Sequence, residues 1–286
     1  MISPGASDSI EAFFLPGTSG RLFSVFHGPL SGPPPSVGVL YIPPFADEMN
    51  KSRRQVSLQT RRLAAQGFGT LCVDLYGTGD SEGHFRDARW NLWIEDLLTA
   101  VSWLKQRGMQ RIILWGVRLG ALLAVDLAGK LAGQEVQMIL WQPVTSGKQF
   151  VGQFLRLRAA AEMMAGDGGL NTTELRAQLQ RGELVEIAGY DLHPELASEI
   201  EARDLRKMPL AEGTRVDWLE IMSESQQTIP PVAGQVVAAW TAIGVDVEVT
   251  AIIGEQFWTT PEIAVVDKLL DKTDQIVGQI LPESQQ

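Results

Sequence analysis

The chain has 286 residues, of which 45% are hydrophobic and 20% charged, and its formal net charge is −10 at pH 7. This composition is typical of a globular protein with a large core and excludes a disordered chain. The acidic balance argues against a nucleic-acid partner, because such binding depends on neutralising phosphates. No apolar run is long enough to span a bilayer, and the start of the chain lacks the features of a signal peptide, so we expect a cytoplasmic protein.

Cysteine content and local charge restrict the disulfides, metal sites and anion-binding sites that the chain can form. The only cysteine, Cys72, lies in an apolar run, which favours a buried and unreactive thiol. A single cysteine excludes a disulfide within the chain and a cysteine-rich metal site, and we expect neither a metal nor a cofactor. The basic cluster from Lys51 to Arg62 is interpreted as a solvated helix face in preference to an anion-binding patch.

The first half of the chain alternates apolar runs of strand length with helical patterns. Residues 10–15 and 21–27, separated by a turn cluster, predict an antiparallel hairpin. The elements expected next are a proline-rich loop at 28–36, a strand at 37–42, a loop at 43–50, a helix at 52–66, a strand at 68–75, a helix at 91–106, a strand from 111, a helix to about 131 and a strand at 136–141. Such alternation predicts a parallel sheet flanked by helices.

The second half interrupts this alternation before resuming it. Three helical segments are expected at 149–164, 172–180 and 194–205, with a glycine-rich break at 166–169 and a short strand at 184–187. Strands at 215–222 and 246–253, a helix at 232–243 between them and a final helix at 262–281 then continue the earlier pattern. The three-helix stretch is therefore predicted to be an insertion into one α/β core.

The stretch from Arg111 to Ala124 organises the whole chain. An apolar strand, a tight turn and a helix follow one another within about a dozen residues. Gly116 and Gly120 suit such a turn, because strand and helix pass too close for a Cβ atom. The frame matches the G-x-S-x-G nucleophile elbow, but Arg118 stands at its tip. An arginine stays protonated, so it is neither a nucleophile nor a base.

Three motifs in this order resemble the α/β-hydrolase superfamily over nearly the whole chain. They are Pro43-Pro44-Phe45-Ala46, the glycine-rich loop from Asp74 to Gly83, and the Gly116–Gly120 frame. The resemblance implies an α/β-hydrolase fold with a mostly parallel central sheet of about eight strands flanked by helices. It further implies a core of residues 1–148 and 213–286, a helical cap at 149–212, and oxyanion-hole amides at Phe45 and Leu119.

More narrowly, the chain resembles the exosortase A system-associated hydrolase 2 family. The segments that carry this resemblance are Pro44–Arg54, Trp115–Gly120, Trp141–Val144 and Phe257–Trp258. It implies a cytosolic protein of Gram-negative bacteria, encoded beside protein-sorting and exopolysaccharide genes. It also implies a hydrolase, without specifying the reaction.

The orthodox catalytic triad is absent. A Ser-His-Asp mechanism needs a histidine after the last strand, but Gly254–Thr259 contains none. Of the three histidines, His27 is expected at a hairpin end and His193 in the cap, while His84 could reach the mouth of the site. We favour a structural role for His84. Ser81 is interpreted as a turn-bonding hydroxyl and not as a relocated nucleophile.

Two roles for Arg118 are open. At a helix start its guanidinium adds a bidentate donor to the first-turn amides, which favours binding of a carboxylate or phosphate. Alternatively, Glu48, Glu224 or Glu255 neutralises Arg118 in a buried pair that blocks the site. The residues expected around this pocket are Phe45, Ala46, Glu48, Arg118, Leu119, Ser223, Glu224, Glu255 and Trp258.

Two functions remain in competition. The first is an atypical hydrolase that acts on an anionic or acyl substrate with carboxylate assistance from Asp47, Glu48, Glu224 or Glu255. The second is a non-catalytic pseudo-hydrolase that binds an anionic ligand or a partner protein at the elbow pocket. The partner protein itself is not encoded in any motif. A probe for nucleophilic serines would separate the two.

Overall fold

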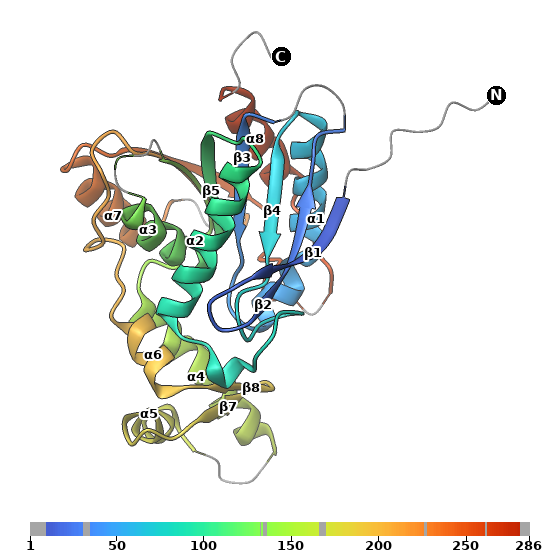
Figure 1. Ribbon diagram of the computed structural model, residues 1–286. Helices are drawn as coiled ribbons and strands as arrows, with labels where there is room; N and C mark the ends of the chain where they lie inside the picture. The colour runs from blue at the N-terminus through green and yellow to red at the C-terminus, as the bar shows by residue number, and fades with distance from the viewer. Residues whose placement is uncertain are drawn as a thin grey trace.

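The central feature of the fold is one twisted sheet (Figure 1). The computed structural model describes residues 10–30, 35–131, 133, 136–165, 170–225, 228–260 and 262–280. The start of the chain, the middle of the expected proline-rich loop, the glycine-rich break at 166–169 and Leu281 lie outside these residues. Within the described part, eight strands follow the order β1-β2-β4-β3-β5-β6-β9-β10. Their bounds are β1 (Ile10–Pro16), β2 (Arg21–His27), β3 (Val37–Ile42), β4 (Gly69–Val73), β5 (Arg111–Val117), β6 (Val136–Trp141), β9 (Arg215–Met222) and β10 (Asp246–Ile253).

Strand directions agree with the predicted mostly parallel sheet. The β1–β2 hairpin is antiparallel, and β2 also pairs antiparallel with β4. Every pair from β4 through β3, β5, β6 and β9 to β10 is parallel. The carboxyl ends of the parallel strands therefore meet at one edge of the sheet, where a fold of this kind places its functional site.

Helices cover both faces of the sheet. Those that follow the strands are α1 (Asp47–Ala65), α2 (Trp90–Gln106), α3 (Leu119–Lys130), α7 (Pro231–Thr241) and α8 (Asp267–Gly278). Successive side chains of β3 point to opposite faces, as a pleated strand requires. Val39 and Tyr41 pack in the cluster that contains α1 and α8, whereas Leu40 and Ile42 pack with α2, α3 and α7. Each face thus has its own apolar layer.

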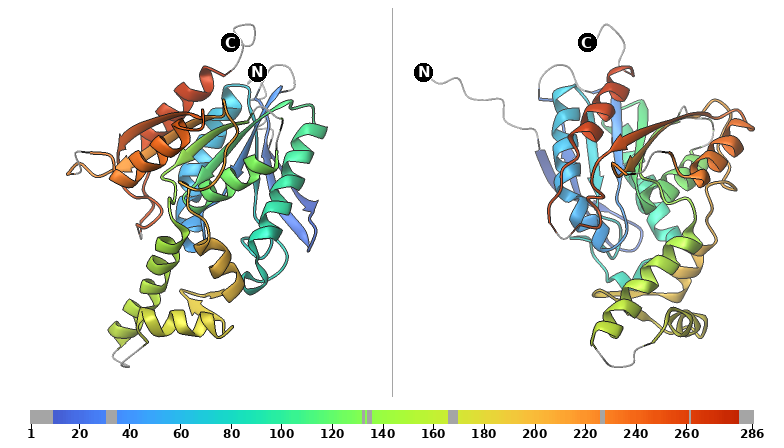
Figure 2. Two further views of the ribbon diagram at one scale, coloured as in Figure 1. Left: turned by 90° about the vertical axis from the view of Figure 1, so that its left-hand side faces the viewer. Right: turned by 180° about the vertical axis from the view of Figure 1, so that it is seen from behind.

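The segment between β6 and β9 lies beyond one end of the sheet (Figure 2). It contains α4 (Gly147–Ala165), α5 (Thr172–Gln180), the antiparallel pair β7 (Val185–Ile187) and β8 (Tyr190–Leu192), and α6 (Pro194–Glu201). Its entry and exit run side by side, because Gly147 N donates to Arg203 O at 2.9 Å and Leu205 N donates to Thr145 O at 3.0 Å. The sequence predicted the short strand β7 but not β8, which follows it after a two-residue turn.

Three predicted helix boundaries are wrong by four or five residues. The loop expected at 43–50 ends early, because α1 begins at Asp47 instead of Ser52. Asp47 and Glu48 therefore lie in the first helical turn, where acidic side chains are stabilised by the helix dipole. The final helix is shorter than expected at its start, since α8 begins only at Asp267. The helix expected at 194–205 ends early, since α6 ends at Glu201. The change at α1 matters most, because it places Glu48 on a helix that starts beside the site.

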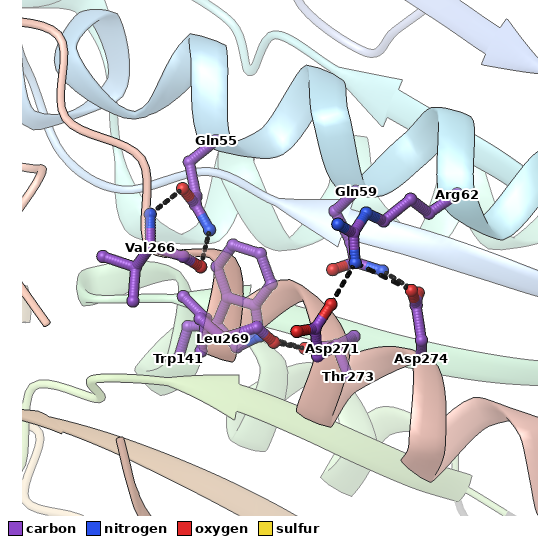
Figure 3. A network of polar contacts seen from close by, with 9 residues as sticks. All are labelled: Gln55, Gln59, Arg62, Trp141, Val266, Leu269, Asp271, Thr273 and Asp274. Carbon is purple, nitrogen blue, oxygen red and sulfur yellow. Dashed lines mark hydrogen bonds and ion pairs between the residues drawn. The ribbon is translucent and has the colours of Figure 1, made fainter. Parts of the chain in front are cut away.

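Buried polar side chains connect α1 to the C-terminal part of the chain (Figure 3). Gln55 Nε2 donates to Val266 O at 3.0 Å, and its Oε1 accepts from Val266 N at 2.9 Å. One turn later, Gln59 donates to Asp274 at 2.8 Å. These contacts satisfy backbone groups that the β10–α8 loop would otherwise bury unpaired. They fix the loop that carries Trp258. Among the described residues, no helix is long and apolar enough to cross a membrane.

Candidate functional site

The turn between β5 and α3 is built around two glycines. A Cβ atom on Gly116 would lie 2.8 Å from Ala121 Cα, and one on Gly120 would lie 2.2 Å from Ile42 O. Neither approach is sterically allowed, so both positions require glycine. Between them Arg118 has φ 54° and ψ −116°, a conformation that side-chain-bearing residues rarely adopt. Its N–H donates to Trp141 O at 3.0 Å, which holds the turn against β6.

Backbone strain is concentrated at this edge of the sheet. Ala46, Arg118 and Gln142 have φ values of 52°, 54° and 43°, and each precedes a helix or follows a strand at the site. A non-glycine residue in this region costs about 1–3 kcal/mol, and such residues gather at functional sites. The backbone conformation at this edge is therefore typical of a functional site, independently of the side chains there.

Arg118 forms an ion pair with Glu48. Its Nη2 lies 3.0 Å from Glu48 Oε1, and its Nε lies 3.3 Å from both carboxylate oxygens. The side chains of Arg118 and Glu48 are only 14% and 19% exposed. Nη1 donates to Gln142 O at 3.4 Å, and the guanidinium lies 4.9 Å from the ring centroid of Trp258. Among the described residues, these contacts leave one N–H of Nη1 and one of Nη2 without an acceptor.

The charges around the pair balance one another. Burial raises the pKa of Glu48 above its ordinary value, and the opposing attraction of Arg118 does not fully offset this effect. Next to the pair, Lys51 and Asp47 form a second ion pair at 2.8 Å. The two cations and two carboxylates cancel. The expected cationic position at Arg118 is therefore internally neutralised, with Glu48 as the acid.

The other acids proposed for Arg118 lie elsewhere. Ser223 and Glu224 are exposed, and the hydroxyl of Ser223 contacts that of Ser225 at 3.0 Å. Glu255 is exposed and lines a separate surface cavity beside residues 262–268. Of the three acids considered, the structure thus brings Glu48 alone to the guanidinium.

Two cavities meet at Phe45. We call the first the elbow cavity: it has a volume of about 230 Å³ and is lined by Phe45, Asp47, Glu48, Lys51, Arg118, Phe150, Gln153, Phe154, Leu157, Trp258 and Thr259. The second, here called the α1–β8 cavity, has a volume of about 430 Å³ and is lined in part by Phe45, Ala46, Leu119 and Tyr190. The buried ring of Phe45 contacts Phe85, Trp93, Phe150 and Phe154 with centroids 5.1–6.1 Å apart. It is the wall between the two cavities.

The sequence matches the model of one known protein family. The family model described as "Serine aminopeptidase, S33" matches residues 48–198, which is more than half of the chain. The chain belongs to this family. The match begins at Glu48, includes the β5–α3 turn and ends within α6. A comparison with curated proteins found no match.

Solved structures support the fold of this serine aminopeptidase family member. Est1E from Butyrivibrio proteoclasticus, solved with ferulic acid bound, has a TM-score of 0.67 at 16% identity, covering 94% of this chain and 98% of that one. A putative hydrolase from Agrobacterium vitis has a TM-score of 0.60 at 17% identity, covering 96% and 99%. An esterase from Pyrococcus furiosus has a TM-score of 0.58 at 14% identity, covering 96% and 91%. At these identities the likeness concerns the fold, and it confirms the predicted α/β-hydrolase architecture.

The family name implies a serine nucleophile, yet the linings of both cavities contain no serine, cysteine or histidine among the described residues. His27 ends β2 and pairs with Thr70 at the start of β4, at the opposite end of that strand from the site loops. His84 caps the short helix at Phe85–Asp87, and His193 caps α6 by accepting from Glu195 N at 3.1 Å. The described residues likewise contain no group of three or more acids, histidines or cysteines that could hold a metal ion.

The remaining candidates have structural roles. Ser81 Oγ donates to Asp74 O and accepts from Phe23 N at 2.8 Å, as expected of a turn hydroxyl. Cys72 is half-buried in β4 instead of fully buried, and desolvation raises the pKa of its thiol to about 12. A thiol with that pKa stays protonated at neutral pH and is a poor nucleophile.

Sequence reasoning missed several residues of the site. Phe150, Phe154 and Leu157 line the elbow cavity from α4. Their i, i+4, i+7 spacing was visible, but such a stripe ordinarily indicates core packing. Gln142 was also missed as a site residue: its side chain bonds Glu220 at 3.1 Å and Ile221 N, while its carbonyl accepts from Arg118. No sequence signal distinguishes a glutamine that orders strand ends in this way.

Proposed function

We propose that this chain is a non-hydrolytic member of its family that binds a small acyl compound in the elbow cavity, above the Arg118–Glu48 pair. The observation that carries the proposal is the pair itself. Arg118 stands where the fold places its nucleophile, and Glu48 holds its guanidinium in place by a two-point contact. A side chain that cannot lose its proton supports binding and not acyl transfer.

The lining of the elbow cavity favours an acyl chain with an uncharged polar end. Phe45, Phe150, Phe154, Leu157 and Trp258 supply apolar walls. At the base, Arg118 offers two N–H groups and Glu48 offers carboxylate oxygens, so a donor and an acceptor lie side by side. A primary amide matches both. A dianionic phosphate fits this base less well, because the surrounding charges already cancel.

The insertion between β6 and β9 is the proposed cap of this cavity. Its first helix, α4, contributes Phe150, Gln153, Phe154 and Leu157 to the lining. We therefore retain the division into a core of residues 1–148 and 213–286 and a cap of residues 149–212. A ligand would then be enclosed between the strand ends and α4.

The narrower resemblance extends the proposal to cellular context. Four segments resemble the exosortase A system-associated hydrolase 2 family, and each contributes to the Arg118 environment: Glu48, Arg118, Gln142 and Trp258. Residues from separate segments that meet at one point support a common function better than scattered matches do. We propose on this basis a cytoplasmic protein that acts within such a protein-sorting system.

The test measures both hydrolytic activity and ligand binding. Purified protein should show no labelling by a fluorophosphonate probe and no turnover of p-nitrophenyl butyrate or octanoate. Octanamide should bind and change the fluorescence of Trp258, which lines the cavity. Arg118→Met should weaken octanamide binding by at least tenfold, whereas Arg54→Met, on the exposed face of α1, should not. Labelling that disappears when one particular serine is replaced would overturn the proposal, as would unchanged octanamide affinity in Arg118→Met.

One observation favours a second candidate, a carboxylate-assisted hydrolase. Glu48 lies in the cavity wall with a pKa raised by burial, and a raised pKa suits a general base near neutral pH. In that case ester turnover would rise with pH as Glu48 loses its proton, and Glu48→Gln would abolish it. Turnover that survives Glu48→Gln would rule out this role.

A further inference from the structure

The α1–β8 cavity has the construction of a second ligand site, distinct from the elbow cavity on the other side of Phe45. Its lining comes from several separate segments: the β3–α1 loop and the start of α1, the β4–α2 loop and the start of α2, the start of α3, and the β7–β8 turn. Its volume of about 430 Å³ lies in the range of small-molecule sites. We infer that it binds an amphipathic monocarboxylate, with the apolar body inside and the carboxylate at Arg53 and Tyr190.

The interior of this cavity has an apolar wall. Its inner wall is formed by side chains that are almost fully buried, namely Phe45, Leu75, Trp93, Leu119 and Leu123. Trp93 Nε1 donates to Tyr76 O at 3.0 Å, so its one polar atom is turned away from the ligand space and used in the fold. An alkyl or aryl group would replace water against these surfaces, which favours binding.

Arg53 lines the cavity and, among the described residues, makes no short ion pair. Its Nη2 is 4.0 Å from Asp74 Oδ2, too far for a hydrogen bond. The same Asp74 oxygen accepts from Asp80 N at 2.9 Å. Arg53 Nε donates to Asn50 Oδ1 at a long 3.4 Å. The two Nη groups therefore offer donors toward the cavity, in contrast with Arg118, whose guanidinium is held by Glu48 at 3.0 Å.

A chain of hydrogen bonds links Arg53 to a second donor. Asn50 accepts from Arg53 through Oδ1 and donates through Nδ2 to Tyr190 Oη at 3.2 Å. Because Tyr190 Oη accepts from Asn50, its own proton is directed elsewhere. The Tyr190 ring packs against Phe85 with centroids 5.0 Å apart, which fixes the position of the hydroxyl. Arg53, from the core, and Tyr190, from β8, can thus donate to the two oxygens of one carboxylate.

Nearby acids select the charge of the ligand. Asp80 lines the same cavity, and Asp74 lies close to Arg53. A dianionic phosphate would meet these carboxylates with only one guanidinium to compensate it. An alcohol would leave the guanidinium without an anion. A single carboxylate on an apolar body satisfies Arg53, Tyr190 and the interior together.

Calorimetric titration of the full chain at pH 8 with octanoate, octanol and inorganic phosphate tests the inference. Octanoate should bind, and phosphate should not. Arg53→Met should weaken octanoate at least tenfold while changing octanol by less than twofold. Tyr190→Phe should weaken octanoate by a smaller factor, and Arg53→Lys should recover part of the loss. Arg54→Met, one residue away on the exposed side of α1, is the matched control and should bind octanoate normally.

Other results would overturn the inference. These are no octanoate binding to the unmodified chain, equal binding in Arg53→Met, or phosphate binding as tight as octanoate. Lys51 lines the elbow cavity. If Lys51→Met weakens octanoate binding as much as Arg53→Met does, the carboxylate binds in the elbow cavity and the inference is wrong. The proposed function fails separately, by ester turnover or serine labelling, so the two conclusions are distinguishable.

Discussion

The side chains of Arg118 and Glu48 are separated by 70 residues in the chain, and each compensates the other in a site with little solvent. Such a pair adds little net stability, because the cost of removing both charges from water offsets their attraction. Removing one member is different, since it leaves the other charge buried and unpaired. The main structural effect of the pair is therefore to occupy the space at the β5–α3 turn without leaving an unpaired charge there.

The pair predicts a pH-dependent mutational effect. The pKa of Glu48 is raised by burial, so its contribution to stability is present at low pH and is lost as pH rises through that pKa. Without Arg118 the pKa of Glu48 rises further. Arg118→Met should therefore lower the free energy of unfolding by about 3 kcal/mol at pH 8 and by much less at pH 5. Urea denaturation at the two pH values measures this difference.

The double variant Arg118→Met/Glu48→Gln is the control for that measurement. It removes both charges, so its stability at pH 8 should lie above that of Arg118→Met alone. Equal losses at both pH values, or a double variant no more stable than the single one, would show that lost packing dominates over the unpaired carboxylate.

At the scale of elements, the β5–α3 turn is a tightly constrained junction. Two glycines of α3 illustrate this, because they lie in the same helix with different surroundings. The space for a Cβ atom at Gly120 is occupied by the carbonyls of Ile42 and Pro43, at 2.2 and 2.7 Å. At Gly129 nothing lies within 4 Å. The contact at Gly120 joins α3 to the end of β3 and sets the position of the loop that begins α1.

This pair of glycines gives a matched prediction. Gly120→Ala should destabilise the protein by about 3 kcal/mol or prevent folding, because the clash is with backbone. Gly129→Ala should stabilise it by about 0.5–1 kcal/mol, since alanine is the better helix former in open space. Thermal and urea unfolding of the two variants provides the test. A neutral Gly120→Ala would mean that α3 can move away from β3.

The elements differ in how well the sequence predicted them. Strands β3, β6, β9 and β10 have the predicted bounds. β3 is a continuous apolar run, and the other three are rich in apolar and β-branched residues with polar residues between them. The start of α1 was missed, since two prolines obscured a helix whose first residues are acidic and polar. Because of the same error, the sequence did not decide which acid pairs with Arg118. Three acids had equal claims from the sequence, and only the extra helical turn at 47–50 decides for Glu48.

At the scale of the whole molecule, several side chains attach the insertion to the core, and Arg203 makes two of these contacts. Arg203 follows α6, stacks on the Trp90 ring at 4.6 Å and lies 3.4 Å from Asp126 of α3. Trp90 in turn donates through Nε1 to Asp126 at 2.6 Å, and its N–H donates to Glu199. These contacts join α2, α3 and α6 at the base of the proposed cap.

Loss of this junction should loosen the insertion selectively. Arg203→Met removes the stacking and the ion pair, which together contribute about 1–2 kcal/mol. Hydrogen exchange in residues 147–205 should accelerate, whereas exchange in the central strands β3 and β5 should not. Arg181→Met is the control, because its carboxylate partner Glu183 lies within the same segment. Uniform acceleration across the sheet would indicate that insertion and core unfold together.

The ring of Phe45 has a consequence for the size of what this protein can hold. It is in contact with aromatic residues of both the β4–α2 loop and α4, and it lines both the elbow cavity and the α1–β8 cavity. The position of this one ring limits the length of an occupant of either cavity. A ligand that displaced the Phe45 ring would enlarge the cavity it occupies and reduce the volume of the other cavity. Binding at one site would therefore weaken binding at the other.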